Sequence, residues 1–226
     1  MKKIIALILA ALMLTMSFVA CTEGGNTETT TEAVDNQTNA PEAEQTTEEV
    51  TEAPVELAYN SAIELLNIVF EKYNAAQATD DTKLWVGGGN INNFDTVNPE
   101  GPGAFVALDA EDYNQNLGFP AANADKVASA ASMFNLMNAN TFNCYAIQFT
   151  DGTDVDAMIT ATKENILARQ WICGSPEKLV IAKAPGNYII VVWGVVEFGG
   201  IVNPVAESFA TSIEGSTIVV EENIAR

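Results

Sequence analysis

The sequence predicts an α+β domain of two layers, in which helices pack on a small, mostly antiparallel sheet of roughly three to five strands. Apolar residues recur at three- and four-residue steps in some segments and alternate in others, which indicates both helices and strands. Two apolar runs flank Pro185-Gly186, a spacing typical of a β-hairpin. About 170 residues follow the N-terminal segments, and this length suits a single domain with its own core.

The first half of the domain is expected to be mainly helical, with one long irregular stretch. A helix is expected over 57–78, with an apolar stripe of Ile63, Leu66, Phe70 and Tyr73. The next expected segments are a strand over 83–86, an Asn-, Gly- and Pro-rich stretch over 87–103, a short strand over 105–108 and a short helix over 110–117. A further helix is expected over 123–137, with Asn123 as its N-cap and Val127, Ala131 and Phe134 inward.

The second half is expected to supply most of the sheet. A central strand is predicted over 141–150, because apolar residues occupy both of its alternating faces: Tyr145, Ile147 and Phe149 on one, and Phe142, Cys144 and Ala146 on the other. A helix over 154–172 follows, with Thr153 and Asp156 as a capping box. The last elements are a hairpin of 179–184 with 188–193, a helix opened by Asn203-Pro204, and a closing strand over 218–220.

The N-terminus predicts export. Lys2 and Lys3 precede a short apolar run, and small residues lead to Cys21, as in a secretory signal. The run is short for a membrane span, which needs about 20 apolar residues. The stretch ending in Ala20-Cys21 resembles the lipobox of bacterial lipoproteins, although Phe18 stands where Leu is preferred. This resemblance implies cleavage after residue 20 and lipidation of Cys21, hence an anchor on the extracytoplasmic face of the bacterial cell membrane. The alternatives are an uncleaved anchor helix and a plain secretory signal.

Residues 21–56 form an acidic segment that we expect to be a disordered tether. It holds ten acidic residues and no basic ones, and it is rich in Thr and Glu. Such a segment cannot bury enough apolar surface to offset its ordering entropy. The predicted domain, 57–226, has eight basic and twenty acidic residues, a net charge of −12. This charge argues against nucleic acid as a partner, because such binding depends on Lys and Arg neutralising phosphates. Cation capture by the tether is the alternative to a solvated spacer.

The stretch from Met133 to Asn203 resembles a family of uncharacterised lipoproteins of Gram-positive anaerobes. The shared features are Tyr145-Ala146-Ile147, Asp154-Val155, Ile172-Cys173-Gly174, Pro176-Glu177 and Gly186-Asn187-Tyr188-Ile189-Ile190. The resemblance covers roughly a third of the chain and consists mainly of fold features. Its C-terminal domain is one of unknown function, so the resemblance implies a place in the cell envelope and no activity. It transfers no catalytic residue.

Several chemistries are excluded by composition. The chain contains no His, which removes Ser-His-Asp and Cys-His catalysis and His-ligated zinc. With Cys21 lipidated, two thiols remain, too few for a Cys-only zinc site. The glycines at 87–89 lack the Lys-Ser/Thr of a P-loop and are interpreted as a loop breaker. We therefore predict no cofactor, no metal site and no catalytic set.

Three groups of carboxylates have weak functional alternatives. Asp151, Asp154 and Asp156 invite a calcium hypothesis, but their spacing lacks the glycine and glutamate of an EF-hand, so helix capping is preferred. Two pairs, Asp109 with Glu111 and Asp95 with Glu100, have the composition of a two-carboxylate glycosidase site. In so acidic a chain, solvated surface carboxylates are the preferred interpretation.

Cys144 and Cys173 are a possible disulfide. From Cys144 the strand rises about 20 Å to Thr150, and the helix from Asp154 returns about 28 Å to Cys173. The two thiols therefore finish within a few residues of the same level, and an exported domain allows a disulfide. Two buried free thiols are the preferred alternative.

The irregular stretch 87–103 is the expected place for a ligand site, because long loops inside compact domains are often functional. The candidate binding residues are Trp85, Asn90, Asn92, Asn93, Phe94 and Asp95. Amides beside aromatic rings suit sugar or peptide recognition. The alternative is a flexible loop whose Trp85 and Phe94 dock on the core. Two functions follow: a non-enzymatic binding or envelope-assembly module with a small ligand or an envelope protein as partner, and a His-free hydrolase of glycans.

Overall fold

The computed structural model describes residues 56–136, 141–171, 174–196 and 200–224. The chain divides into two units, Met1–Glu52 and Ala53–Arg226, and every described residue belongs to the second. Cys21 and Cys173 therefore lie outside the described residues, as do the predicted signal peptide and nearly all of the tether. None of the helices in the described ranges has the length and apolar character that a membrane crossing requires.

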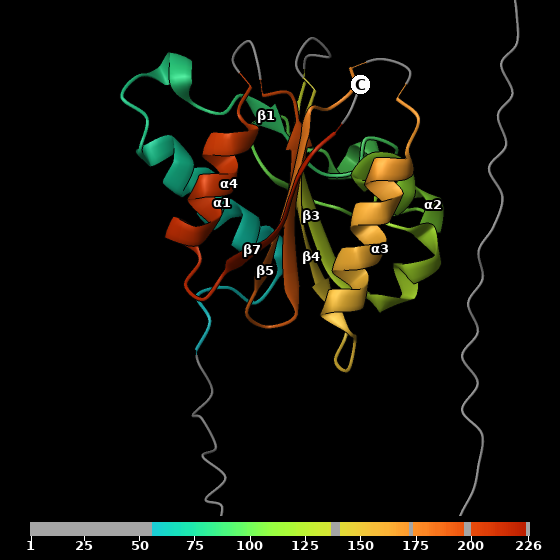
Figure 1. Cartoon of the computed structure of the whole chain (residues 1–226). Coiled ribbons are helices and arrows are strands. Elements are labelled where there is room, and N and C mark those ends of the chain that lie inside the picture. The colour runs from blue at the N-terminus through green and yellow to red at the C-terminus, as the bar shows by residue number, and fades with distance from the viewer. Residues whose placement is uncertain (1–55, 137–140, 172–173, 197–199, 225–226) are drawn as a thin grey trace, which may run out of the picture. The chain divides into compact units, whose positions relative to one another are not determined.

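The described part is built on an antiparallel sheet of seven strands, in the order β1-β3-β4-β6-β5-β7, with β2 also paired to β3. The strands are β1 (Val86–Gly87), β2 (Gly103–Ala104), β3 (Val127–Asn135), β4 (Phe142–Phe149), β5 (Lys178–Ala184), β6 (Tyr188–Gly194) and β7 (Thr217–Asn223). Helices lie on both faces of the sheet (Figure 1). The predicted α+β class is confirmed, and the sheet has more strands than the three to five expected.

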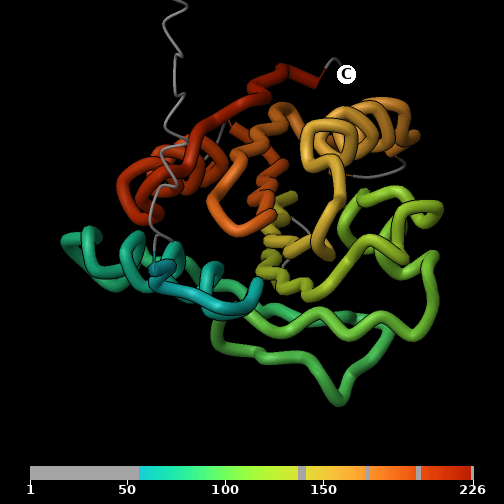
Figure 2. Tube along the Cα trace, turned by 90° about the horizontal axis from the view of Figure 1, so that it is seen from below, coloured from blue at the N-terminus to red at the C-terminus, as the bar shows by residue number. Residues whose placement is uncertain are grey.

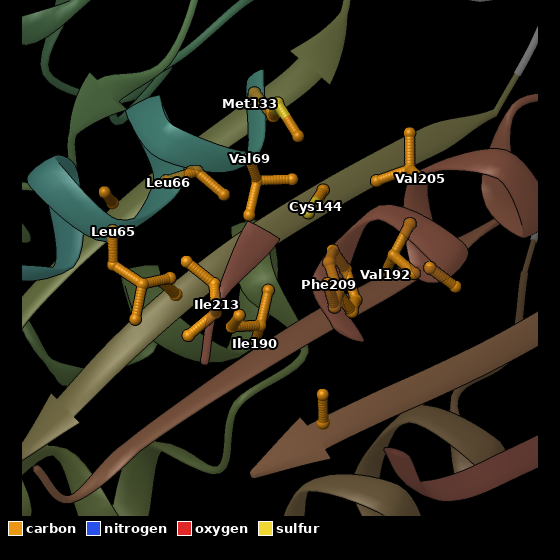
Figure 3. Packing of buried hydrophobic residues seen from close by; sticks show 14 of the residues in the cluster. Leu65, Leu66, Val69, Met133, Cys144, Ile190, Val192, Val205, Phe209 and Ile213 are labelled. Carbon is orange, nitrogen blue, oxygen red and sulfur yellow. The ribbon is translucent and has the colours of Figure 1, made fainter. Parts of the chain in front are cut away.

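One face of the sheet is covered by α1 (Ala62–Ala75) and α4 (Val202–Ser212). Figure 3 shows their side chains meeting those of β3, β4 and β6. Fully buried members of this cluster include Leu65, Leu66, Val69, Cys144, Ile190, Val192, Val205 and Phe209. The apolar stripe of α1 is shifted from the predicted one, because Ile63 and Phe70 are only partly buried. We call this side the α1/α4 face.

The opposite face carries a second core under α3 (Val155–Ala168). It contains Phe119, Tyr145, Ile147, Ile166, Ile181, Ile189 and Val191 among its fully buried members. The short helix α2 (Ala110–Asp112) and the π-helical turn Tyr113–Leu117 lie beside α3 (Figure 1). We call this side the α3 face. The two faces of β4 match the alternation predicted for it, since its two apolar sets enter different cores.

Residues 123–137 were expected to form a helix, and this prediction is wrong. A 3₁₀ turn, Ala121–Lys126, leads into β3, which pairs with β4 on one side and with β1 and β2 on the other. Ala, Ser and Met favour helices locally, but propensity is a weak prior when a chain segment fills a central strand position. Small side chains suit this position, since Ser132 Oγ accepts from Gly89 N at 3.0 Å and donates to Gly89 O at 2.8 Å.

The segment between α1 and β3 passes from the α1/α4 face to the α3 face around the β3 edge of the sheet (Figure 2). Its backbone crosses itself closely where Gly88 meets Gly103. A Cβ on Gly88 would lie 2.2 Å from Gly103 N, so no larger residue fits. Gly88 also pairs with Asn98 in an antiparallel bridge. The glycines at 87–89 are therefore structural, as their interpretation as a loop breaker required.

The remaining elements agree with the sequence apart from their boundaries. β5 and β6 form the predicted hairpin across Pro185–Asn187, and β7 closes the sheet. Residues 105–108 lie outside the strands, because β2 ends at Ala104. The N-cap of α3 is Asp154, whose carboxylate accepts from Asp156 N and Ala157 N at 3.1 Å each. Thr153 was expected to cap this helix, but its hydroxyl bonds to that of Thr150 instead.

Candidate functional site

The structure separates the candidate binding residues. Trp85 is 78% exposed and Phe94 is 82% exposed, so neither docks on the core as the flexible-loop alternative required. Asp95 is exposed, within the 3₁₀ turn Phe94–Thr96. Asn93 donates to Val106 O at 3.3 Å.

The side chains of Asn90 and Asn92 donate hydrogen bonds to a buried carboxylate. Both amides donate to Asp112, Asn90 to Oδ2 at 2.8 Å and Asn92 to Oδ1 at 2.6 Å. The backbone N–H of Leu108 donates to Oδ2 at 2.7 Å. Burial raises the pKa of Asp112, but these hydrogen bonds outweigh it and hold the pKa below its usual value. Asp112 is thus an ionised anchor that fixes the loop, and the amides expected to meet a ligand are already paired.

The other carboxylate groups are structural or exposed. Asp109 caps α2 by accepting from Glu111 N and Asp112 N, and Glu111 accepts from Asn114. Asp95 and Glu100 are exposed, and neither lines a described cavity. Asp156 pairs with Lys183 at 2.8 Å. Among the described residues, no group of three acidic or Cys side chains has the arrangement of a metal site.

Cys144 is a free thiol, fully buried on the α1/α4 face. Burial raises the pKa of this thiol well above its usual range, which keeps it protonated and unreactive. The helix that leads toward Cys173 lies on the opposite face. Because Cys173 is outside the described residues, the disulfide stays a prediction.

A cavity of about 530 Å³ opens on the α3 face at one end of the sheet. Its walls come from three places. The sheet contributes Phe134, Asn143 and Trp193 from β3, β4 and β6, which are neighbours in the register. The chain after α3 contributes Arg169 and Trp171, and the π-helical turn contributes Gln115, Asn116 and Leu117. We call this space the α3-face cavity.

Backbone carbonyls of the π-helical turn hold the cavity together. Gln115 O accepts from Arg169 Nη2 at 2.9 Å, Asn116 O from Asn143 Nδ2 at 2.9 Å, and Leu117 O from Trp193 Nε1 at 3.4 Å. Three successive carbonyls therefore bind side chains from the chain after α3, from β4 and from β6. Asn116 also donates to Asn90 Oδ1 at 3.2 Å, which links the cavity to the Asp112 anchor.

Two residues that line the cavity each have a buried polar atom without a partner. Asn143 is 8% exposed, and its Oδ1 is buried without a hydrogen bond. Its amide orientation is set by the bond from Nδ2 to Asn116 O. Trp171 Nε1 is also buried without an acceptor. An unpaired buried polar atom costs about 1–3 kcal/mol, so an arrangement that leaves two of them beside one cavity suggests a site for a bound group.

Aromatic rings and one cation complete the cavity. Trp171 and Trp193 contact each other with ring centroids 4.9 Å apart and planes at 55°. The guanidinium carbon of Arg169 lies 4.6 Å from the Trp171 ring centroid, a cation–π contact. Burial lowers the pKa of Arg169 from its usual value, and the group stays charged at neutral pH. No Asp or Glu is among the described residues that line this cavity.

A second cavity, of about 550 Å³, lies beside the first and shares Asn135, Thr141 and Phe142 with it. Trp85 lines it, together with Tyr73, Leu84 and Ile201. None of the buried atoms without a partner belongs to its described lining. The α3-face cavity is therefore the stronger candidate.

Comparison of the chain with protein-family models, with curated proteins and with solved structures gave no match. The resemblance to the lipoprotein family therefore stays a prediction.

Sequence reasoning missed the residues that line the α3-face cavity. Arg169 and Trp171 lie at the end of a predicted helix, and nothing in the local sequence distinguishes them from other residues at a helix terminus. Asn143 was passed over within an apolar strand. One signal was present: the run from Phe142 to Phe149 holds two amides, Asn143 and Gln148, and an amide within a buried strand has to find partners, because buried polar groups are normally hydrogen-bonded.

Proposed function

We infer that this protein is a non-enzymatic binding module of the bacterial cell envelope, and that its ligand occupies the α3-face cavity. The observation that carries this proposal is the pair of unpartnered buried atoms, Asn143 Oδ1 and Trp171 Nε1, which belong to two residues that line one open cavity. Its volume of about 530 Å³ falls within the range of roughly 300–1,000 Å³ that is typical of small-molecule sites.

The lining favours binding over hydrolysis. A two-carboxylate hydrolase needs an acid and a base, or an acid and a nucleophile, beside the bound sugar. The described lining of the cavity offers amides, indoles and Arg169, which recognise a ligand but do not transfer protons at neutral pH. The carboxylates considered from sequence lie elsewhere, at the cap of α2 and on exposed turns.

We place the module outside the cell membrane, held by lipid on Cys21. The basic start, the short apolar run and the lipobox-like stretch before Cys21 support this location, and the acidic segment 21–56 has the composition of a spacer. Two acyl chains give stable anchoring, since each buried CH₂ contributes about 0.8 kcal/mol. Metabolic labelling with a fatty acid tests the anchor: the full chain incorporates label and Cys21→Ser does not. Label retained in the variant would contradict lipidation at this residue.

Thermal denaturation of the full chain with monosaccharides, oligosaccharides, muropeptides and short peptides tests the binding function. A ligand that binds only the folded state raises the melting temperature by mass action. Trp171→Ala removes an indole from the α3-face cavity, whereas Trp85→Ala removes an exposed indole from outside it and serves as the matched control. We expect at least one ligand class to stabilise the unmodified protein and Trp85→Ala, but not Trp171→Ala. The absence of any shift, or an equal shift in both variants, would contradict the proposal.

A further inference from the structure

The unsatisfied groups of the α3-face cavity specify what a ligand has to carry. Asn143 Oδ1 is an acceptor, because the Nδ2 of this amide is committed to Asn116 O. The matching ligand group is an O–H or N–H donor. Trp171 Nε1 is a donor, and it requires an acceptor on the ligand. A purely apolar ligand satisfies neither atom.

The cavity also offers apolar surface at its mouth. Ile91 is 48% exposed and Leu136 is 55% exposed, and both line the opening together with Phe134. Trp171 also lines this cavity. A ligand that fits has a compact ring with an apolar face and polar groups around its rim.

Arg169 adds a preference for an anion. Five lysines in the described ranges pair with carboxylates: Lys83, Lys126, Lys163, Lys178 and Lys183. Arg169 has no such pair, and its recorded hydrogen bonds go to the carbonyls of Asn114 and Gln115. Two hydrogen bonds leave part of its five-donor fork unused. In an acidic domain, this is an unpaired cation at a cavity whose described lining holds no carboxylate.

Together with the proposed binding function, on which this step rests, these groups identify a ligand class. We propose that the α3-face cavity binds an acidic sugar, a pyranose that carries a carboxylate. The hydroxyls supply a donor to Asn143 Oδ1 and an acceptor to Trp171 Nε1, the C–H face of the ring packs on the apolar wall, and the carboxylate meets Arg169. Simple aromatic carboxylates such as benzoate lack the hydroxyl donors, and neutral sugars leave Arg169 unpaired. Polyphosphates would meet one cation in the described lining, within a domain of net charge −12.

Calorimetric titration of the full chain with matched sugars tests the ligand class. The pairs are N-acetylmuramic acid against N-acetylglucosamine, and glucuronate against glucose, with benzoate and a short peptide as further probes. In each pair the members share the pyranose ring: N-acetylmuramic acid adds a lactyl ether that carries the carboxylate, and glucuronate has a carboxylate in place of the C6 hydroxymethyl group. We expect the acid to bind about tenfold or more tightly than its neutral partner, the scale of one hydrogen bond to a charged group. The preference should weaken as salt is raised.

Two variants distinguish the effect of the Arg169 charge at the cavity from the effect of the net charge of the domain. Arg169→Gln removes the cation but keeps an amide donor toward the carbonyls of the π-helical turn, and it should abolish the preference for the acid. Lys72→Gln changes the net charge by the same one unit on α1, across the sheet, and should leave the preference unchanged. Equal loss in both variants would overturn the role of Arg169.

The outcomes distinguish the ligand class from the binding function. Equal binding of acidic and neutral sugars, or binding of benzoate or peptide without sugars, would overturn the acidic-sugar proposal and leave the binding module standing. Binding of none of these probes, together with no thermal shift from the wider panel, would overturn both.

Discussion

The two faces of the sheet are buried by different means. On the α1/α4 face, helices seal the sheet with fully buried apolar side chains, as Figure 3 shows for Leu66, Val69 and Phe209. On the α3 face, the apolar core gives way at one end to amides, indoles and Arg169 around a cavity. Of the described buried side-chain atoms without a partner, only Tyr188 OH belongs to the α1/α4 core; the others are Asn143 Oδ1, Tyr145 OH, Thr162 Oγ1 and Trp171 Nε1.

This difference separates stability from recognition within one sheet. The α1/α4 face is almost entirely apolar, and its main contribution is to the free energy of folding. The polar end of the α3 face leaves hydrogen-bonding capacity unused, which costs stability and gives a ligand something to bind. We therefore expect substitutions on the two faces to have opposite profiles in stability and in binding.

The largest effect is expected from Phe209→Ala on the α1/α4 face. Removal of a fully buried ring should lower the free energy of unfolding by about 3–5 kcal/mol. Trp171→Ala should cost clearly less, because that ring is only partly buried and its N–H has no partner to lose. Urea denaturation of both variants measures the difference. Equal losses would mean that the cavity wall is as important to stability as the sealed core.

The next largest effect concerns Asp112. Asp112→Asn should lower the free energy of unfolding at pH 7 by about 1–3 kcal/mol, because the new NH2 group has to face either the Asn92 donor or the donors of Asn90 and Leu108 N. The folded-state pKa of Asp112 lies below its unfolded value, so its carboxylate stabilises the fold above about pH 4 and this contribution is lost as pH falls through the folded pKa. The gap between unmodified protein and variant should therefore narrow below pH 4. Parallel pH curves would contradict an ionised anchor.

Two tyrosines test whether a buried hydroxyl without a hydrogen-bond partner lowers the stability of the fold. Tyr145→Phe removes a buried hydroxyl without a partner and should raise the free energy of unfolding by about 1 kcal/mol. Tyr59→Phe removes a hydroxyl that donates to Pro185 O at 3.0 Å, and should lower it by about 0.5–1.5 kcal/mol. Thermal or urea unfolding gives both signs. A loss of stability in Tyr145→Phe would show that its hydroxyl has a partner in solution.

The smallest effect is expected at Phe94. Its ring is 82% exposed, so Phe94→Ser should change the free energy of unfolding by no more than about 0.5 kcal/mol. Chemical denaturation measures this directly. A loss of several kcal/mol would instead support the sequence-based alternative in which this ring docks on the core.

The local pattern of apolar and polar residues predicted those elements whose burial depends mainly on their own sequence. The strand over 142–149 has apolar residues on both faces, and it lies in the middle of the sheet as expected. The segment 127–135 was misassigned, because its small residues are good helix formers and only the approach of Gly88 and Gly89 explains why a strand needs them there. That approach comes from a chain segment about 40 residues away, which no local window contains.

The candidate site was harder to predict for the same reason. Asn90 and Asn92 have amides that could bind a ligand, but their donors are bonded to Asp112, which lies 20 or more residues later in the chain. Conversely, Asn143, Arg169 and Trp171 are unremarkable in their own segments. They form a candidate site because the carbonyls of the π-helical turn hold Asn143 and Arg169 at one end of the sheet, beside Trp171.

The three tryptophans of the chain provide the most direct test, because each indole N–H gives its own NMR signal. Trp171 and Trp193 line the α3-face cavity, whereas Trp85 lies outside it and is exposed. On titration of the full chain with N-acetylmuramic acid, we expect the indole signals of Trp171 and Trp193 to shift with one saturation curve and that of Trp85 to stay in place. Shifts confined to Trp85 would place the ligand at the second cavity and contradict a binding site on the α3 face.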